Sequence, residues 1–252
     1  MDWTDEAIVL STRRFGETGT IAMLLTRGHG RHAGLARGQR RLAALQPGTS
    51  VQARWRARQA DNLGSYVLEA ERSGAAALID DPLRLAALSS ACALVEAGLP
   101  ERAPYPDVYA GLAALVEVLP GEFWDAVYVQ WELGLLAALG FGLSLERCAA
   151  TGANDTLAYV SPRTGRAVSL AAAEPYRDRL LPLPGFLIGR GEAAPPEVLN
   201  GLTLTGHFIE RLLFAQAHAP VPAARERFVE RYRRWAGSAA GEVGIPGRTD
   251  EG

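Results

Sequence analysis

Residues 51–58 alternate strictly between apolar and polar side chains, and this pattern limits what the N-terminal part of the chain can fold into. A period of two is typical of a half-buried β-strand, because successive side chains of a strand point to opposite faces. The members expected to face a core are Val51, Ala53, Trp55 and Ala57, and those expected to face outward are Gln52, Arg54, Arg56 and Arg58. Trp55 is therefore expected inside a β-domain, not stacked on a bound base.

The same region is basic. Eight arginines and no acidic residue lie between positions 27 and 58, although the whole chain has a net charge of -2. Arginines at alternate positions of a strand lie about 7 Å apart, which matches the spacing of phosphates along a nucleic-acid backbone. The alternative is a solvated strand face with counter-ions. The candidate DNA-binding residues are Arg37, Arg40, Arg41, Arg54, Arg56 and Arg58, with Arg27 and Arg31 as lesser contributors.

Segments rich in β-forming residues, separated by turn residues, indicate five short strands near the N-terminus. They are expected at 7–12, 20–26, 31–37, 51–58 and 65–71. Five such strands favour a small barrel of the oligonucleotide-binding (OB) type over half of a sandwich. We therefore predict an OB-fold nucleic-acid-binding domain over residues 1–75. Residues 1–72 hold eleven arginines and seven acidic residues, a net charge of +4, whereas residues 73–252 carry a net charge of -6.

From residue 80 onward the pattern changes to helices. Asp81 before Pro82 is typical of a helix N-terminus, and Gly98 with Pro100 marks the end of that helix. Further helices are expected at 106–119, 122–140, 196–217 and 222–236. The sequence thus predicts a multi-domain β plus α protein. Its second, mainly α-helical domain spans 76–236 with an irregular insert at about 144–172, and residues 237–252 are expected to form a disordered tail.

Three motifs resemble the RecO family of recombination mediators: FGETGTI at 15–21, LLTRGHGR at 24–31 and GLARGQRR at 34–41. The order of parts is similar too, because a cysteine-bearing insert follows Phe141 and Gly142. The resemblance covers residues 5–235. It implies an OB-fold barrel fused to a helical domain, binding of single- and double-stranded DNA, and strand annealing. It also implies cooperation with the ring protein RecR, displacement of single-strand-binding protein and loading of the recombinase.

The chain departs from many relatives in the insert, where they carry a zinc knuckle of two Cys-x-x-Cys pairs. Cys148 occupies the first ligand position, but the other three positions hold Thr151, Ser169 and Ala172. Zinc in structural sites takes four ligands, mainly thiolates and imidazoles, and no histidine lies between Cys148 and Ser169. We therefore expect a degenerate zinc-knuckle insert without metal, and no cofactor.

The last expected helix has a basic edge that suits an acidic partner. Ala224, Phe228, Tyr232 and Trp235 form an apolar stripe that is more often core than ligand platform. Arg227, Arg231 and Arg234 flank this stripe. A basic rim beside an apolar groove suits an acidic peptide that ends in an aromatic residue. The resemblance implies that the helical domain binds such a tail, the C-terminus of single-strand-binding protein.

No pattern of residues indicates an enzyme. The four histidines and the two cysteines are not spaced as a catalytic triad or a metal site, and Cys92 is expected to be a small core residue. Without a secretory signal or a run of 18 apolar residues, a cytoplasmic, nucleoid-associated protein with no membrane partner is expected. The alternative to a mediator is an OB-fold adaptor for RNA or DNA without annealing activity.

Overall fold

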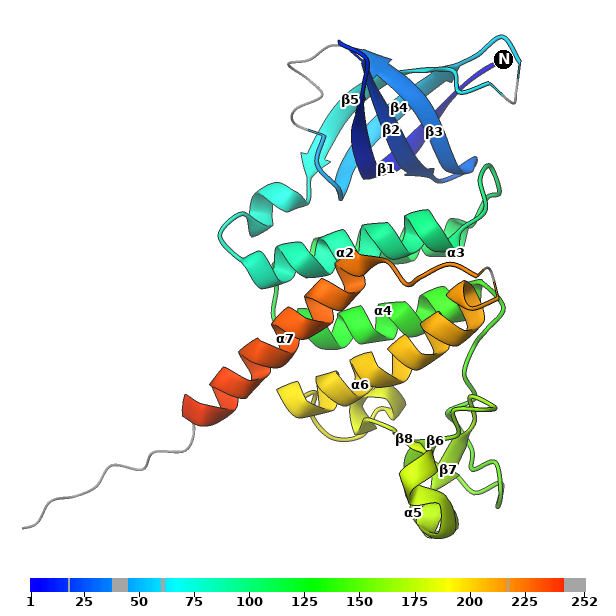
Figure 1. Cartoon of the computed structure of the whole chain (residues 1–252), viewed down its shortest axis with the longest axis vertical. Coiled ribbons are helices and arrows are strands. Elements are labelled where there is room, and N and C mark those ends of the chain that lie inside the picture. The colour runs from blue at the N-terminus through cyan, green and yellow to red at the C-terminus, as the bar shows by residue number, and fades with distance from the viewer. Residues whose placement is uncertain (18, 38–44, 60–61, 217, 243–252) are drawn as a thin grey trace, which may run out of the picture.

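The computed structural model describes residues 1–242 apart from 18, 38–44, 60–61 and 217. A β-barrel lies at one end of the molecule, a bundle of helices lies in the middle, and a small sheet lies at the other end (Figure 1). Helix α2 runs directly beneath the barrel. Among the described residues, no helix is long and apolar enough to cross a membrane.

The barrel confirms the predicted five strands. They are β1 (Asp2–Phe15), β2 (Gly19–Thr26), β3 (Gly30–Arg37), β4 (Thr49–Arg56) and β5 (Ser65–Ser73), closed in the order β1-β2-β3-β5-β4. All neighbours are antiparallel except β3 and β5, and this closed order fits an OB-fold. Val51, Ala53 and Trp55 point into the barrel with exposures of 2% or less, as their alternation predicts. The Trp55 Nε1 donates to the carbonyl oxygen of Leu63 at 3.0 Å.

Several strand boundaries differ from the sequence prediction by a few residues, and two of these differences concern residues discussed above. Strand β1 begins at Asp2 instead of residue 7, because Trp3 pairs with Trp55 and packs against the barrel core. Strand β4 ends at Arg56, so the expectation that Arg58 lies on its outward face is wrong. The Ala57 N–H still donates to the Met1 carbonyl at 3.0 Å, but Arg58 lies in a bend.

The helical domain contains α2 (Pro82–Gly98), α3 (Pro106–Val118), α4 (Trp124–Ala138), α6 (Pro195–Phe208) and α7 (Ala223–Glu242). A short 3₁₀ helix, η1 (Ala75–Leu78), joins it to the barrel, and a π-helical turn, η4 (Ile209–Phe214), continues α6. The Asp81 side chain caps α2 by accepting from the backbone N–H groups of Leu83 and Arg84. Helix α7 runs six residues past the predicted end, so the tail expected from 237 is helical as far as Glu242. The rest of that tail lies outside the described residues.

The insert is more regular than the sequence indicates, and its sheet continues past the expected end at about residue 172. Its strands β6 (Leu157–Val160), β7 (Ala167–Ser169) and β8 (Leu181–Pro182) form a sheet in the order β7-β6-β8, followed along the chain by η3 (Gly185–Ile188). Between β7 and β8 lie α5 (Leu170–Ala173) and the 3₁₀ helix η2 (Glu174–Arg179). Each strand is four residues or shorter, and segments of that length give little periodic signal.

The hydrophobic core of the helical domain extends onto the outside of the barrel, whereas the interior of the barrel forms a core of its own. Ile8, Leu10 and Leu25 project outward from the β1–β2 face of the barrel and are nearly completely buried among residues of the helical domain. The sulfur of Cys92 on α2 lies 3.8 Å from the Val9 carbonyl oxygen, which confirms that Cys92 is a core residue. Part of the outer barrel surface is therefore closed to any ligand.

Candidate nucleic-acid interface

The exposed arginines of β4 form the simplest anion-binding feature. Arg54 lies between Thr4 on β1 and Val67 on β5, and Arg56 lies between Asp2 and Ser65. Both arginines are exposed, and neither has an ion-pair partner among the described residues. The row is short, because the next outward position is Gln52 and its direct neighbours are Glu6 and Glu69.

Arg27 is exposed but has protein partners. Its Nη1 lies 3.0 Å from the Glu6 carboxylate, and its guanidinium lies 6.0 Å from the centre of the Tyr109 ring on α3. An exposed ion pair of this kind is weak, so a phosphate could displace Glu6. The structure leaves Arg27 available for DNA only in competition with this carboxylate.

Arg31 binds the helical domain instead of facing solvent. Its Nε donates to the Leu99 carbonyl at 2.8 Å, its Nη1 lies 3.5 Å from the Glu101 carboxylate, and its backbone carbonyl accepts from Arg102 N–H at 2.8 Å. The side chain is only 17% exposed. Arg31 thus fastens β3 to the connection between α2 and α3, which sequence reasoning had not foreseen because these partners are about 70 positions away.

The remaining candidates do not complete a single surface. Arg37 ends β3 opposite Gly19, whereas Arg31 stands at the other end of the same strand, roughly 20 Å away at 3.3 Å per residue. Arg40 and Arg41 lie outside the described residues. The six predicted arginines that the structure describes are therefore spread around the barrel, and of these only Arg54 and Arg56 lie next to each other on one face.

The sequence interpretation missed a cleft between the barrel and the helical domain. It has a volume of about 470 Å³. The residues that line it are Ser11, Arg13, Ile21, Met23, Ala33, Leu63, Glu96, Glu101 and Arg102. The Arg102 guanidinium donates to the Asn62 carbonyl at 3.1 Å, which holds one wall against the β4–β5 loop. No short motif marks this site, because its lining residues come from separate parts of the chain.

Aromatic and imidazole rings fill one end of the barrel. The Trp3 ring stacks on His29 with centroids 4.2 Å apart and lies 5.7 Å from the Trp55 ring. The His29 Nδ1 is 3.0 Å from the Asp5 carboxylate, a pair that the wide sequence separation concealed. Burial, reinforced by the positive charge of Arg102, lowers the pKa of His32 from 6.5 to about 4, so this ring is neutral at pH 7.

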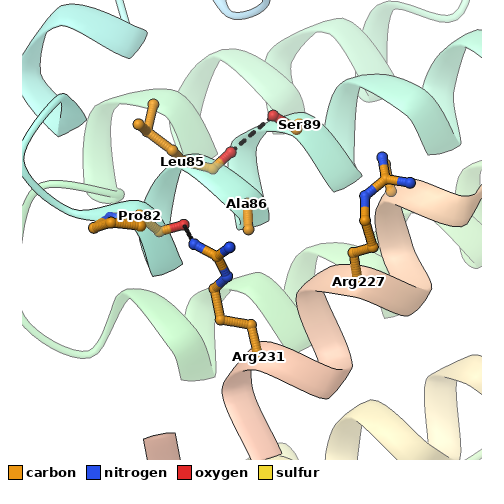
Figure 2. Close-up of a pocket in the computed structure, with 7 residues that line it drawn as sticks. Pro82, Leu85, Ala86, Ser89, Arg227 and Arg231 are labelled. Carbon is orange, nitrogen blue, oxygen red and sulfur yellow. Dashed lines mark hydrogen bonds between the residues drawn. The ribbon is translucent and has the colours of Figure 1, made fainter. Parts of the chain in front are cut away.

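A shallow groove lies between α2 and α7. Its lining residues are Pro82, Leu85, Ala86, Ser89, Ala224, Arg227 and Arg231, and its volume is about 290 Å³. Figure 2 shows Arg227 and Arg231 reaching from α7 toward α2, where Arg231 donates to the Pro82 carbonyl at 3.1 Å. Of the apolar stripe that was expected in the core, Phe228 and Tyr232 are buried but Trp235 is 42% exposed. Arg234 is paired with Glu230 instead of joining the groove.

Three of the four expected ligand positions of the insert, Cys148, Thr151 and Ser169, are in contact. The Cys148 sulfur lies 3.4 Å from the Ser169 Oγ and accepts the Ser169 N–H at 3.3 Å. Burial raises the pKa of the Cys148 thiol, but hydrogen bonds with Ser169 and Thr151 outweigh it and lower the pKa to about 6. The described contacts thus bring one thiol and two hydroxyls together, whereas zinc in structural sites is mainly bound by thiolates and imidazoles. Nowhere in the described residues do three or more histidine, cysteine or acidic side chains gather as metal ligands would.

Comparison with known proteins identifies the relatives of this chain. The family model for the recombination protein O N terminal matches residues 1–72, and that for the recombination protein O C terminal matches residues 79–219. A DNA repair protein RecO of Rhodospirillum centenum is 61% identical over 239 residues, which cover 93% of this chain and 96% of that protein. The DNA repair protein RecO of Rhodospirillum rubrum is 51% identical over 247 residues, which cover 94% of this chain and 98% of that protein.

Proposed function

The chain belongs to the RecO family of DNA repair and recombination proteins, and from this premise we propose that it is a non-enzymatic recombination mediator. In this proposal the barrel binds single- and double-stranded DNA and anneals complementary strands. With the ring protein RecR, the protein helps to load the recombinase onto single-stranded DNA that is coated with single-strand-binding protein.

The observation that carries the DNA-binding part is the pair Arg54 and Arg56 on the outside of a closed OB-type barrel. Both guanidiniums lack an ion-pair partner among the described residues, so no ion pair within that part of the chain has to be broken when they bind a phosphate. Arginine also binds phosphate through two parallel N–H groups. Charge neutralisation lowers the repulsion between two strands that are held together, and pairing is then faster without any bond being made or broken.

An annealing experiment tests this function. Complementary oligonucleotides coated with the cognate single-strand-binding protein are mixed with and without this protein, in low salt and without nucleotide. We expect the protein to accelerate pairing above the spontaneous rate. An unchanged rate at saturating protein would leave a nucleic-acid-binding adaptor, and competition between single-stranded DNA and structured RNA would then identify its ligand.

We propose that the α2–α7 groove binds the acidic C-terminal tail of single-strand-binding protein. Leu85, Ala86 and Ala224 offer an apolar surface, and Arg227 and Arg231 offer positive charge at its rim. Replacing Arg227 and Arg231 by alanine should weaken binding of the tail peptide about tenfold or more. The matched control replaces Arg233 and Arg234, which are both paired with Glu230. Equal losses in the two variants would argue against this groove.

We propose that hydrogen bonds take the place of the metal in the insert. The contacts of Cys148 with Ser169 and Thr151 hold together the segments that a zinc ion joins in many relatives. The purified protein should contain no stoichiometric zinc, measured by elemental analysis. The triple variant Thr151→Cys, Ser169→Cys and Ala172→Cys should gain about one zinc per chain. About one zinc in the natural protein would contradict this proposal.

A further inference from the structure

Strand β5 is paired along its length on one side and only at its start on the other. It pairs with β4 from Ser65 to Ser73, whereas its parallel pairing with β3 involves only Ser65 and Tyr66. Strand β3 ends at Arg37, one position beyond its last pair with β5. From Val67 onward, β5 therefore has one side without a neighbouring strand in the part of the chain that the structure describes.

The backbone of this free side is available for hydrogen bonds. In an antiparallel pair, every second residue directs its N–H and C=O groups away from the partner strand. No described residue outside β4 forms a hydrogen bond with the backbone of residues 67–72. Val67 is 62% exposed, and residues 69–72 are exposed as well. Unpaired backbone groups along such an edge can pair with an extended segment of another protein, a common mode of peptide recognition.

The charges of β5 determine which segment fits. Glu69 and Glu71 are exposed and have no ion-pair partner among the described residues. Arg72 does not neutralise them, because it lies 2.6 Å from the Glu117 carboxylate. Two carboxylates repel a nucleic-acid backbone. They also disfavour pairing with the β5 of a second copy, because antiparallel pairing centred on Ala70 places Glu69 opposite Glu71. A segment with lysine or arginine is attracted instead.

The usable length of the edge is short. The pairing of β4 with β5 is irregular between Ser50 and Val51, where Glu71 has no direct partner, and such a bulge bends and twists a strand. The flat part therefore runs from Val67 to Ala70. Side chains at alternate positions share one face of a strand, so Val67 and Glu69 point to the same side. A partner strand should thus place an apolar side chain beside Val67 and a basic one beside Glu69.

We propose that the edge of β5 from Val67 to Ala70 binds an extended segment of a partner protein in which apolar and basic residues alternate. The segment adds a strand to the barrel, so that backbone hydrogen bonds supply affinity and the side chains of Val67 and Glu69 supply specificity. Arg54 lies next to Val67 on β4, away from the free side, so the outer face of β4 stays open. The inference does not depend on the proposed DNA binding.

The probe is a fluorescent hexapeptide of alternating valine and lysine, and its binding to the full chain is measured by anisotropy. Two control peptides have the same sequence and charge, but each carries N-methyl groups on one of the two sets of alternate amides, which removes those donors. We expect the unmodified peptide to bind, and one of the methylated peptides to bind at least about tenfold more weakly. Hydrogen exchange of the amides on the free side of residues 67–70 should slow when the unmodified peptide is added.

An exchange of charge tests the role of Glu69. Glu69→Lys should weaken binding of the valine–lysine peptide about tenfold, and this variant should bind a valine–glutamate peptide instead. Glu146→Lys, an equal change of charge on an exposed residue of the insert, should do neither.

Four results would overturn the proposal. Equal effects of the two substitutions, or equal binding of the unmodified and both methylated peptides, would show attraction by net charge alone. Failure of the unmodified peptide to bind would remove the site. Slow exchange of the free-side amides without any peptide would show that the edge is already covered by the chain itself or by a second copy.

Discussion

His32 shows how a single buried side chain can link the stability of the barrel to pH. The ring is 3% exposed, close to Trp55 and Tyr66, and its Nδ1 lies 3.1 Å from the Tyr66 hydroxyl. Burial is the largest cause of its lowered pKa, and Arg102 adds to it from the helical domain. The folded protein therefore binds a proton at this site less readily than the unfolded chain does.

The stability of the protein should consequently fall in acid. The His32 pKa is about 4 in the folded state and 6.5 in the unfolded chain, so the contribution of a neutral His32 is complete above pH 6.5 and is lost as the pH falls toward 4. The full loss is about 3 kcal/mol. Urea unfolding at pH 7.5 and pH 4.5 measures most of this loss, because pH 4.5 lies just above the folded-state pKa. His32→Gln, which does not titrate, should lose distinctly less between the two conditions, and an equal loss would contradict this assignment.

The buried pair Glu132 and Arg225 joins α4 to α7. The Arg225 Nε lies 2.7 Å from one carboxylate oxygen of Glu132, which is fully buried, and an Arg225 Nη2 also donates to the Leu202 carbonyl on α6. Glu132→Ala should destabilise the fold by about 3–5 kcal/mol, because a guanidinium is left buried without its counter-charge. The double variant Glu132→Ala, Arg225→Met should recover most of this loss in thermal unfolding. A double variant as unstable as the single one would contradict the explanation.

At the scale of elements, β4 should determine how DNA binding depends on salt. Replacing Arg54 and Arg56 by alanine removes two phosphate contacts, so the slope of log affinity against log salt should flatten by up to about two units. Titrations of a single strand between 50 and 200 mM salt, about the range over which the effect is large, measure the slope. The control variant Arg233→Ala, Arg234→Ala changes the net charge equally but acts on α7. Identical slopes in both variants would exclude a direct role for β4.

Regular elements with a strong pattern could be predicted from the sequence, and elements that depend on distant partners could not. The alternation at 51–58 gave the orientation of β4 and the burial of Trp55, because one face of that strand packs on a core. The full length of β1, in contrast, depends on its pairing with β4 near Trp3. The short strands of the insert depend on contacts across about 10 to 20 residues, which a local period does not record.

The candidate site could also be predicted only as far as it depends on local sequence. Counting charges found the arginines, but a count does not say which guanidiniums are already bound by protein groups. The Arg31 guanidinium binds the Leu99 carbonyl and the Glu101 carboxylate, whereas Arg54 has no ion-pair partner among the described residues. The interdomain cleft joins residues from β1 to the α2–α3 connection, so no single stretch of sequence could have indicated it.

At the scale of the whole molecule, the joint between the domains requires a glycine. Gly30 has a φ of +69°, and a Cβ atom at this position would lie 1.9 Å from the Ala103 carbonyl oxygen. Gly30→Ala should therefore force β3 away from the α2–α3 connection, at a cost above the roughly 1–3 kcal/mol of a strained φ alone. Gly16→Ala is the control, because its φ is +63° and no atom lies within 4 Å of the added Cβ. Equal losses of thermal stability would show that the joint tolerates the side chain.

The burial of Ile8, Leu10 and Leu25 among helical residues also decides how the protein can be taken apart. A fragment that stops after β5 would expose an apolar surface to water, and such a surface promotes aggregation. The helical fragment would likewise expose the apolar residues against which Ile8, Leu10 and Leu25 pack. Separate DNA-binding and partner-binding fragments should thus aggregate. Heating the intact chain should unfold both domains in one cooperative transition. Assigning activities to each half is a task for point substitutions, not truncations.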